Sequence, residues 1–143
     1  MIRAAETTAD AEAVRELFRE YAAGLGLDLS FQGFDAELAD PLGFYELVLL
    51  APGACVALRR IDAETCEMKR LFVRPAVRGG GLGRQLSETI VSEARARGYR
   101  RMLLDTLPTM AAARALYESL GFRETEAYRY NPVPGTMFLE LAL

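Results

Sequence analysis

The residues best suited to chemistry in this chain form a glycine-rich loop between an apolar run and a helical pattern. Residues 71–84 read LFVRPAVRGGGLGR, and Arg78, Gly81 and Gly83 form an Arg-x-x-Gly-x-Gly motif next to the helix expected from Leu82. Glycine leaves backbone N–H groups uncovered, and the first N–H groups of a helix have no intrahelical partner. The loop therefore favours binding of a phosphate or pyrophosphate group.

Positive charge is concentrated around this loop. The stretch 69–84 has five basic residues and no acidic residue, although the 143-residue chain has a formal net charge of −3. The basic residues are Lys69, Arg70, Arg74, Arg78 and Arg84. A dinucleotide fingerprint fails because Arg84 stands where its third glycine is required, and no Gly-Lys-Ser/Thr of a Walker loop is present. Taken alone, the cluster fits either a phosphate site or a flexible turn between a strand and a helix.

A second motif lies further along the chain, where residues 113–122 read ARALYESLGF. Together the two segments resemble the GCN5-related N-acetyltransferase (GNAT) superfamily. Its members carry Q/R-x-x-G-x-G/A at the start of one helix and A-x-x-L-Y-x-x-x-G-F at the end of a later one. The resemblance is most specific over residues 67–122. Met110 stands where many members have Asn, which removes one expected polar contact to the pantetheine arm.

The resemblance implies an enzyme that uses acetyl-CoA and moves the acetyl group to a primary amine by direct attack, through a tetrahedral intermediate. It places the pyrophosphate on the glycine loop and pairs the pantetheine arm with the preceding strand, like an added strand. The implied cofactor contacts are Leu71, Phe72, Val73, Arg78, Gly79, Gly80, Gly81, Leu82, Gly83 and Arg84. A bulge in that strand would aim a backbone N–H at the thioester oxygen.

Two side chains are candidates for proton transfer. Glu67 lies on the strand where histone-acetylating relatives carry a Glu general base, and an amine with a pKa of about 10.4 must lose a proton before it attacks. Glu67 equally fits a surface carboxylate, either solvated or paired with Lys69 or Arg70. Tyr117 falls on the Tyr that relatives place beside the cofactor sulfur. It would stabilise or protonate the leaving thiolate, or else it only packs its helix on the sheet.

The acceptor is less well defined by the sequence. In relatives its pocket is built by the first two helices, the strand that carries Glu67 and the last hairpin. The residues indicated are Gln32, Phe34, Asp35, Arg70, Tyr128, Arg129 and Tyr130. Two arginines would suit a carboxylate-bearing acceptor such as an amino acid, although an exposed arginine on a sheet edge fits a solubility role as well. A small-molecule amine is the first hypothesis. A protein or peptide amine and a non-catalytic acyl-CoA sensor are the alternatives.

Composition restricts the remaining classes of function. The chain has no histidine, which excludes Ser-His-Asp and Cys-His nucleophile pairs and His-ligated metal sites. Cys55 and Cys66 lie in apolar stretches, which predicts buried, reduced residues and no metal or disulfide. Negative net charge argues against nucleic acid. No signal peptide and no apolar run of about 20 residues are found, so we expect a cytoplasmic protein without a membrane partner. A homodimer is left open.

The pattern of elements predicts one N-acetyltransferase domain over residues 1–143, of the α/β (α+β) class. We expect a single mixed, twisted central sheet with helices on both faces, split around the acetyl-CoA cleft. Strands are expected at 2–4, 45–51, 54–61, 66–73, 101–106, 123–128 and 137–143, and helices at 10–25, 35–40, 82–98 and 110–120. Thr7, Thr8 and Asp10 should start the first helix, and Pro41 should end the second.

Overall fold

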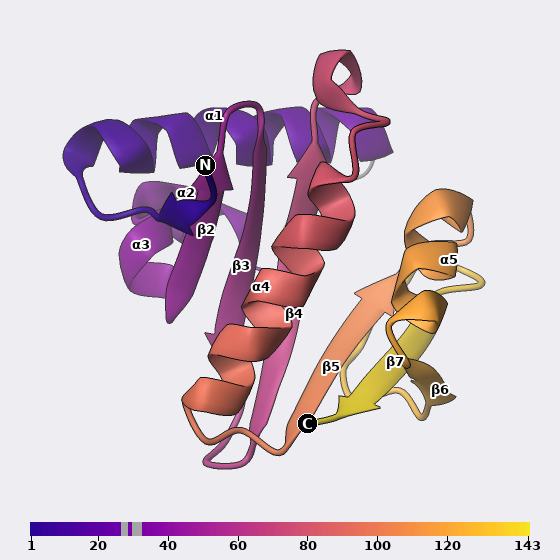
Figure 1. The fold of residues 1–143 in the computed structure, drawn as a ribbon. Helices are drawn as coiled ribbons and strands as arrows, with labels where there is room; N and C mark the ends of the chain where they lie inside the picture. Colours follow the sequence, from indigo (N-terminus) through magenta and orange to yellow (C-terminus); the bar gives the residue numbers. More distant parts are fainter. Residues whose placement is uncertain (27–28, 30–32) are drawn as a thin grey trace.

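One seven-stranded sheet organises the protein, in the order β1-β2-β3-β4-β5-β7-β6 (Figure 1). The computed structural model describes residues 1–26, 29 and 33–143. The strands are β1 Arg3–Ala4, β2 Leu47–Ala51, β3 Ala54–Arg60, β4 Thr65–Val73, β5 Arg101–Thr106, β6 Arg123–Thr125 and β7 Met137–Ala142. Neighbouring strands are antiparallel except β4 and β5, which run parallel. The predicted mixed sheet is confirmed.

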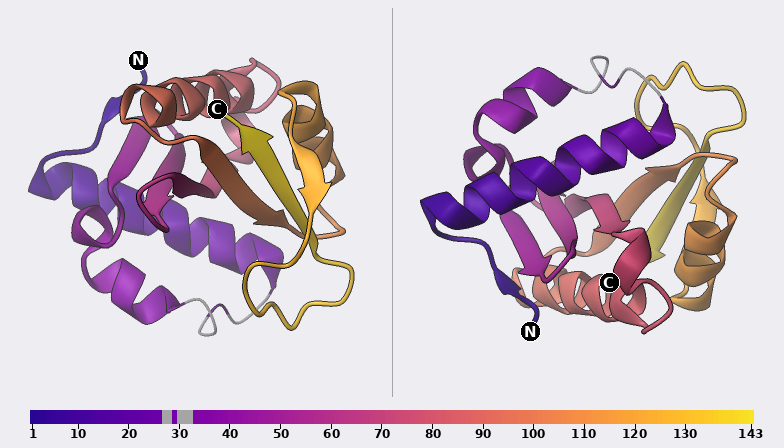
Figure 2. Two further views of the ribbon diagram at one scale, coloured as in Figure 1. Left: turned by 90° about the horizontal axis from the view of Figure 1, so that it is seen from below. Right: turned by 90° about the horizontal axis from the view of Figure 1, so that it is seen from above.

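Helices cover both faces of the sheet, as predicted (Figure 2). They are α1 Thr8–Leu25, α2 Phe34–Ala39, α3 Pro41–Phe44, α4 Leu82–Ala96 and α5 Ala111–Ser119, with a 3-10 turn at Pro75–Val77. The first three helices pack on one apolar core, and α4 and α5 pack on the other. Alternate residues of each strand supply the two cores because successive side chains point to opposite faces. Within the described residues, no helix is both long and apolar enough to cross a membrane.

The start of α1 has the cap that the sequence predicts. The Thr7 hydroxyl accepts a hydrogen bond from the Asp10 N–H at 3.0 Å, and the Asp10 carboxylate accepts one from the Thr7 N–H at 3.2 Å. This capping box satisfies backbone donors that the first helical turn leaves open. Gly26, with a φ of 65°, ends the helix in the left-handed conformation.

Most boundaries lie within two residues of the prediction, and two regions need comment. The second helix ends before Pro41, as predicted, but Pro41 also begins a further short helix, α3, for which Asp40 is the N-cap. The Asp40 carboxylate accepts from the Gly43 N–H at 3.1 Å, and the fixed φ of proline suits a first helical turn. The penultimate strand ends at Thr125, so residues 126–136 form a long connection to β7.

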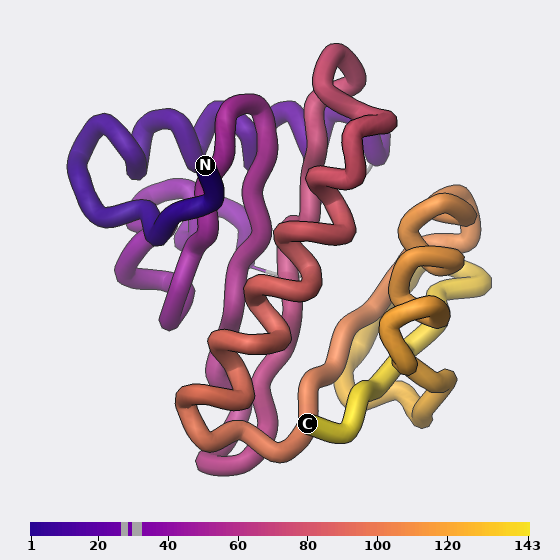
Figure 3. Tube along the Cα trace, in the orientation of Figure 1, coloured from indigo at the N-terminus to yellow at the C-terminus, as the bar shows by residue number. Residues whose placement is uncertain are grey.

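The sheet splits between β4 and β5. The two strands pair over three positions, the last joining Glu67 to Leu103, and then diverge (Figure 3). Close to the split, β4 contains one extra residue relative to β3, since Ala57 pairs with Lys69 but Cys55 pairs with Phe72. The bulge includes Arg70, whose φ of 58° lies in the left-handed region. The predicted split and bulge are thus both present, and a bulge turns local backbone groups out of the ladder.

Candidate active site

An open groove of about 640 Å³ follows the free edge of β4, between the glycine loop and the start of α5. Most of the predicted cofactor contacts line it. They are Leu71, Phe72, Val73, Arg78, Gly79, Gly81, Leu82 and Gly83. Gly80 and Arg84 are not among the lining residues, and the Arg84 side chain instead hydrogen bonds to Ser119 on α5. The fold therefore brings together both sequence motifs along one groove.

The loop presents backbone to this groove. Gly79 and Gly81 have φ values of 90° and 80°, which are strained for residues with a Cβ. Gly81 is the N-cap of α4 and contributes no side chain, so no side-chain cap covers the first N–H groups of the helix. A Cβ at Gly83 would lie 3.8 Å from the Val73 side chain, an ordinary contact. The protein therefore leaves room for a Cβ atom at Gly83.

Much of the positive charge near the loop is already paired. Arg74 contacts the Glu20 carboxylate at 2.7 Å, and Arg70 contacts Glu37 at 2.7 Å. Arg78 donates from Nε to the carbonyl of Val73 at 2.7 Å, and in the described residues it has no carboxylate partner. The loop is thus a backbone cradle with Arg78 beside it, which fits a pyrophosphate group.

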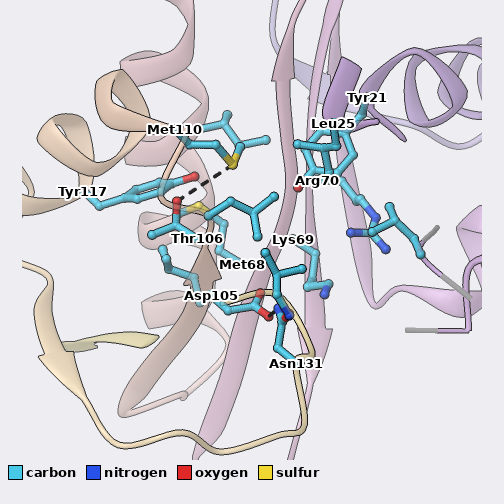
Figure 4. A pocket seen from close by; sticks show the side chains of 15 residues that line it. Tyr21, Leu25, Met68, Lys69, Arg70, Asp105, Thr106, Met110, Tyr117 and Asn131 are labelled. Carbon is cyan, nitrogen blue, oxygen red and sulfur yellow. Dashed lines mark hydrogen bonds between the residues drawn. The ribbon is translucent and has the colours of Figure 1, made fainter. Parts of the chain in front are cut away.

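A smaller cavity adjoins the groove at the fork between β4 and β5 (Figure 4). Its volume of about 30 Å³ holds one or two water molecules. The cavity and the groove share the lining residues Tyr21, Leu25, Leu71 and Met110, so the two lie side by side. The polar residues around the cavity are Tyr21, Lys69, Arg70, Asp105, Thr106, Tyr117 and Asn131.

Tyr117 lies on α5, and its hydroxyl is directed into this cavity (Figure 4). No described residue hydrogen bonds to that hydroxyl, and burial raises the pKa of Tyr117 above its ordinary value. The ring also packs edge-on against Phe122, with centroids 5.8 Å apart. The two sequence interpretations are compatible, because the ring packs the helix while the hydroxyl borders the cavity.

Glu67 has an environment that the sequence did not indicate. Its side chain is 0% exposed and does not line the cavity. The carboxylate accepts hydrogen bonds from the Tyr128 hydroxyl at 2.6 Å, from Arg129 at 2.8 Å and from Arg59 at 3.3 Å. The alternative of an exposed surface carboxylate is therefore wrong. Full burial and three donors favour a structural role for Glu67 over direct proton transfer.

The predicted acceptor residues do not form one site. Arg70 is 4% exposed, so the expectation of an exposed sheet-edge arginine is wrong for this residue. Its guanidinium leaves the cavity for Glu37 and lies 5.5 Å from the ring centroid of Phe34. Arg129 is bound to Glu67, as described above. Tyr130 is 76% exposed, and Gln32 lies outside the described residues.

Several polar residues at the fork, among them Asp105, Lys69 and Asn131, were not singled out from the sequence as site residues. Asp105 is the last residue but one of β5 and accepts a hydrogen bond from the Asn131 side chain at 3.1 Å. Lys69 is buried, and this burial lowers its pKa to about 8. The signal that could have found Asp105 is its place at the carboxyl end of a strand, beside the split in a parallel pair.

Comparisons with known proteins define the family. Residues 39–124 match the model of the Acetyltransferase (GNAT) domain. The chain is 38% identical to an uncharacterised N-acetyltransferase of Schizosaccharomyces pombe, over 99% of this chain and 94% of the relative. Over shorter stretches it is 44% identical to the IAA acetyltransferase of Azospirillum brasilense, covering 54% of this chain and 51% of that protein. It is 38% identical to the N-acetylaspartate synthetase of Danio rerio, covering 53% and 28%.

Solved structures share the fold. An acetyltransferase of Streptococcus agalactiae matches with a TM-score of 0.73 and 24% identity, over 100% of this chain and 98% of the other. A GNAT family acetyltransferase of Elizabethkingia anophelis, solved with acetyl-CoA bound, matches with a TM-score of 0.57 and 21% identity, over 68% and 74%. The chain belongs to the GNAT acetyltransferase family, and it is an N-acetyltransferase that uses acetyl-CoA as its acetyl donor.

Proposed function

We propose that the protein acetylates the primary amine of a small molecule that also carries a carboxylate, such as an amino acid or its derivative. The observation that carries this proposal is the fork cavity, where Lys69 and Asp105 supply a cation and an anion to one small space. A zwitterionic acceptor has the complementary pair of charges. Opposite charges that face each other in a site of low dielectric give specificity and orientation.

The groove fits the donor. The thioester of acetyl-CoA supplies the activated acetyl group, so no covalent enzyme intermediate is required. In this proposal the loop of Gly79, Gly81 and Gly83 holds the pyrophosphate, and the free edge of β4 pairs with the pantetheine amides. The bulge at Arg70 interrupts the regular pairing of β4 close to the fork, and in this proposal a backbone N–H there stabilises negative charge on the reacting oxygen.

The Tyr117 hydroxyl is placed to donate a hydrogen bond to the thiolate that leaves. A raised pKa keeps this phenol protonated across the working pH range, which suits a donor. The same raised pKa makes complete proton transfer from Tyr117 less favourable, because the thiol that receives it has an ordinary pKa of about 8.5. Hydrogen-bond stabilisation is therefore the role we propose for Tyr117.

Two further observations support a small acceptor. The space at the fork admits only a polar group of a few atoms. Binding of an acceptor must therefore displace lining side chains. A small molecule is better suited to this space than an amine on a bulky protein surface. The name of a partial relative also points this way, since the N-acetylaspartate synthetase of Danio rerio is named for an acetylated amino acid.

The test is a thiol-release assay with matched acceptors. Each amino acid is paired with the amine that lacks only its carboxylate, for example phenylalanine with phenethylamine, and a lysine-containing peptide is added. We expect kcat/KM to be at least about tenfold higher for the acid-bearing partner, as one charge-assisted contact provides. Equal values within pairs, or a preference for the peptide, would overturn the proposed acceptor class.

Lys69→Met supplies the matched control, because it keeps the length of the side chain and removes the charge. It should abolish the preference within each pair while it leaves kcat/KM for the carboxylate-free amine within about threefold. A preference that survives in this variant would place the carboxylate contact elsewhere.

A further inference from the structure

We propose that Asp105, and not Glu67, is the carboxylate that receives the proton from the acceptor's amino group. The proposal rests on the function proposed above and names a catalytic residue for it. It follows from which of the two carboxylates borders the cavity where donor and acceptor meet.

The fold separates the two carboxylates at the fork. Glu67 lies at the last paired position of β4 with β5, where its carboxylate is enclosed by Arg59, Tyr128 and Arg129. Asp105 lies two positions beyond the corresponding point on β5, after the strands have diverged, and it lines the cavity together with Tyr117 (Figure 4). An acceptor nitrogen in this cavity can therefore reach Asp105 without a change in the network around Glu67.

The carboxylate of Asp105 is oriented but not saturated. The Asn131 amide donates to Oδ2 at 3.1 Å, whereas Oδ1 accepts no hydrogen bond from any described residue. One oxygen is thus held by Asn131, and the other is available to a ligand. A general base must lie within hydrogen-bond reach of the proton it accepts, and a fixed rotamer reduces the entropic cost of that geometry.

Titratable and charged groups from several elements face Asp105. The titratable groups that act on it are Tyr21 from α1, Lys69 from β4, Tyr117 from α5 and Tyr128 from the connection before β7. Lys69 is the one cation among them, and the tyrosines are neutral at working pH. Arg70 lines the same cavity, but its guanidinium is turned away to Glu37. Asp105 therefore offers a negative charge to an incoming ammonium group.

The protons balance as follows. An acceptor that binds as an ammonium ion loses two protons, since the amide product keeps one hydrogen on nitrogen. The first proton passes to Asp105 and from there to solvent. The second leaves the nitrogen as the N–C bond forms and the C–S bond breaks, again to Asp105. The sulfur gains one proton from solvent while Tyr117 donates a hydrogen bond to it, so one proton is released overall.

The experiment compares Asp105→Asn with Glu67→Gln over the full pH–rate profile. The acceptor is the best carboxylate-free amine, so that Lys69 has no acceptor carboxylate to contact. We expect Asp105→Asn to lower the rate at pH 7 by about a hundredfold or more, and the deficit to shrink to about threefold near pH 10, where the amine is neutral unaided. Affinity for acetyl-CoA, measured by calorimetry, should stay within about twofold.

Glu67→Gln removes the same charge from the neighbouring carboxylate and serves as the comparison. Glu67→Gln should lower the rate by the same factor at every pH, because we attribute its loss of activity to a disturbed hydrogen-bond network around residue 67. Asp105→Glu keeps a carboxylate, so its rate should rise with pH over the same range as that of the wild type. This variant tests the proposal if Asp105→Asn does not fold. A parallel profile for Asp105→Asn, or a pH-dependent loss in Glu67→Gln, would overturn the assignment.

The two proposals fail in different ways. If the wild-type enzyme prefers amines without a carboxylate, the proposed acceptor class is wrong. The pH–rate profile of Asp105→Asn can still be measured with such an amine, and it still decides whether Asp105 is the proton acceptor. If the acid-bearing acceptors are preferred but Asp105→Asn has a parallel profile, only the proton acceptor is wrong. Absence of turnover with any amine would overturn both.

Discussion

The guanidinium of Arg70 forms a bidentate pair with the Glu37 carboxylate, at 2.7 and 2.9 Å, with both side chains enclosed in the protein. The pair joins α2 to the bulge in β4. The Arg70 guanidinium also lies 5.4 Å from the ring centroid of Tyr21 on α1. Arg70 is therefore held from two helices at the point where its own backbone has a φ of 58°. These contacts offset the cost of that conformation, which amounts to about 1–3 kcal/mol for a non-glycine residue.

Loss of one partner of this pair should destabilise the protein strongly. Glu37→Gln keeps the shape but leaves a buried guanidinium without its counter-charge, and we expect the free energy of unfolding to fall by about 3–5 kcal/mol. Urea denaturation measures it. Glu12→Gln is the control, because its pair with Arg15 lies on the surface, and a change of at most about 0.5 kcal/mol is expected. If the free energy of unfolding of Glu37→Gln changed by no more than that of the control, the pair would contribute little to stability.

A side chain at Gly83 should block the donor without harming the fold. A Cβ at this position meets only ordinary contacts within the protein, 3.8 Å from Val73 and 3.9 Å from Leu116, and the side chain lies at the groove beside the start of α4. Gly83→Val should therefore weaken acetyl-CoA binding by about tenfold or more in calorimetry. Ser92→Val places the same β-branched residue on an exposed position of α4 and should leave the affinity unchanged. Full affinity in Gly83→Val would mean that the pyrophosphate lies elsewhere.

The sequence predicts those parts of the fold and site that depend on local backbone requirements. The glycine loop and the cap at Thr7 follow from residue types whose conformational preferences act over a few positions, whereas the bulge in β4 was expected from the family resemblance alone. The end of α2 before Pro41 was predicted, but the short helix α3 was not, because proline fits a first helical turn as well as a terminus, and only Asp40 as a cap decides between them.

Side-chain partners across the sheet could not be predicted in this way. Glu67, Arg70 and Arg129 read as exposed or acceptor-facing residues, since charged residues are rarely buried. Their burial depends on partners that are distant in sequence. Arg70 pairs with Glu37, 33 positions away, and Glu67 pairs with Arg129, 62 positions away. Asp105 was missed for the same reason, because its role depends on the divergence of β4 from β5 and not on its neighbours in sequence.

Tyr117→Phe separates the chemical role of the hydroxyl from the packing of the ring. The ring contact with Phe122 remains, so stability and acetyl-CoA affinity should be retained, whereas turnover should fall by about tenfold or more. Tyr99→Phe is the control, because its hydroxyl hydrogen bonds to Glu46, which lines neither the groove nor the cavity. Equal turnover in Tyr117→Phe and wild type, with reduced stability, would leave packing as the function of this residue.

Lys69 should give the acceptor preference a distinct pH dependence. Burial lowers its pKa to about 8, so the ammonium group is charged below that pH and becomes neutral above it. The ratio of kcat/KM for an amino acid to that for its carboxylate-free partner should therefore fall as the pH rises through about 8. Titration of the two acceptor amines largely cancels in this ratio when their own pKa values are matched.

The same lowered pKa has a consequence for stability, with the opposite sign from the acceptor preference. Between pH 8 and about 10.4 the unfolded chain binds a proton at Lys69 that the folded protein does not bind, so the free energy of unfolding should rise with pH in this window. Lys69→Met lacks the group, and its stability relative to wild type should fall over the same range. Denaturant titrations at pH 7.5 and 10 measure the difference. A constant difference, together with a preference ratio that does not change with pH, would show that Lys69 titrates as an ordinary exposed lysine.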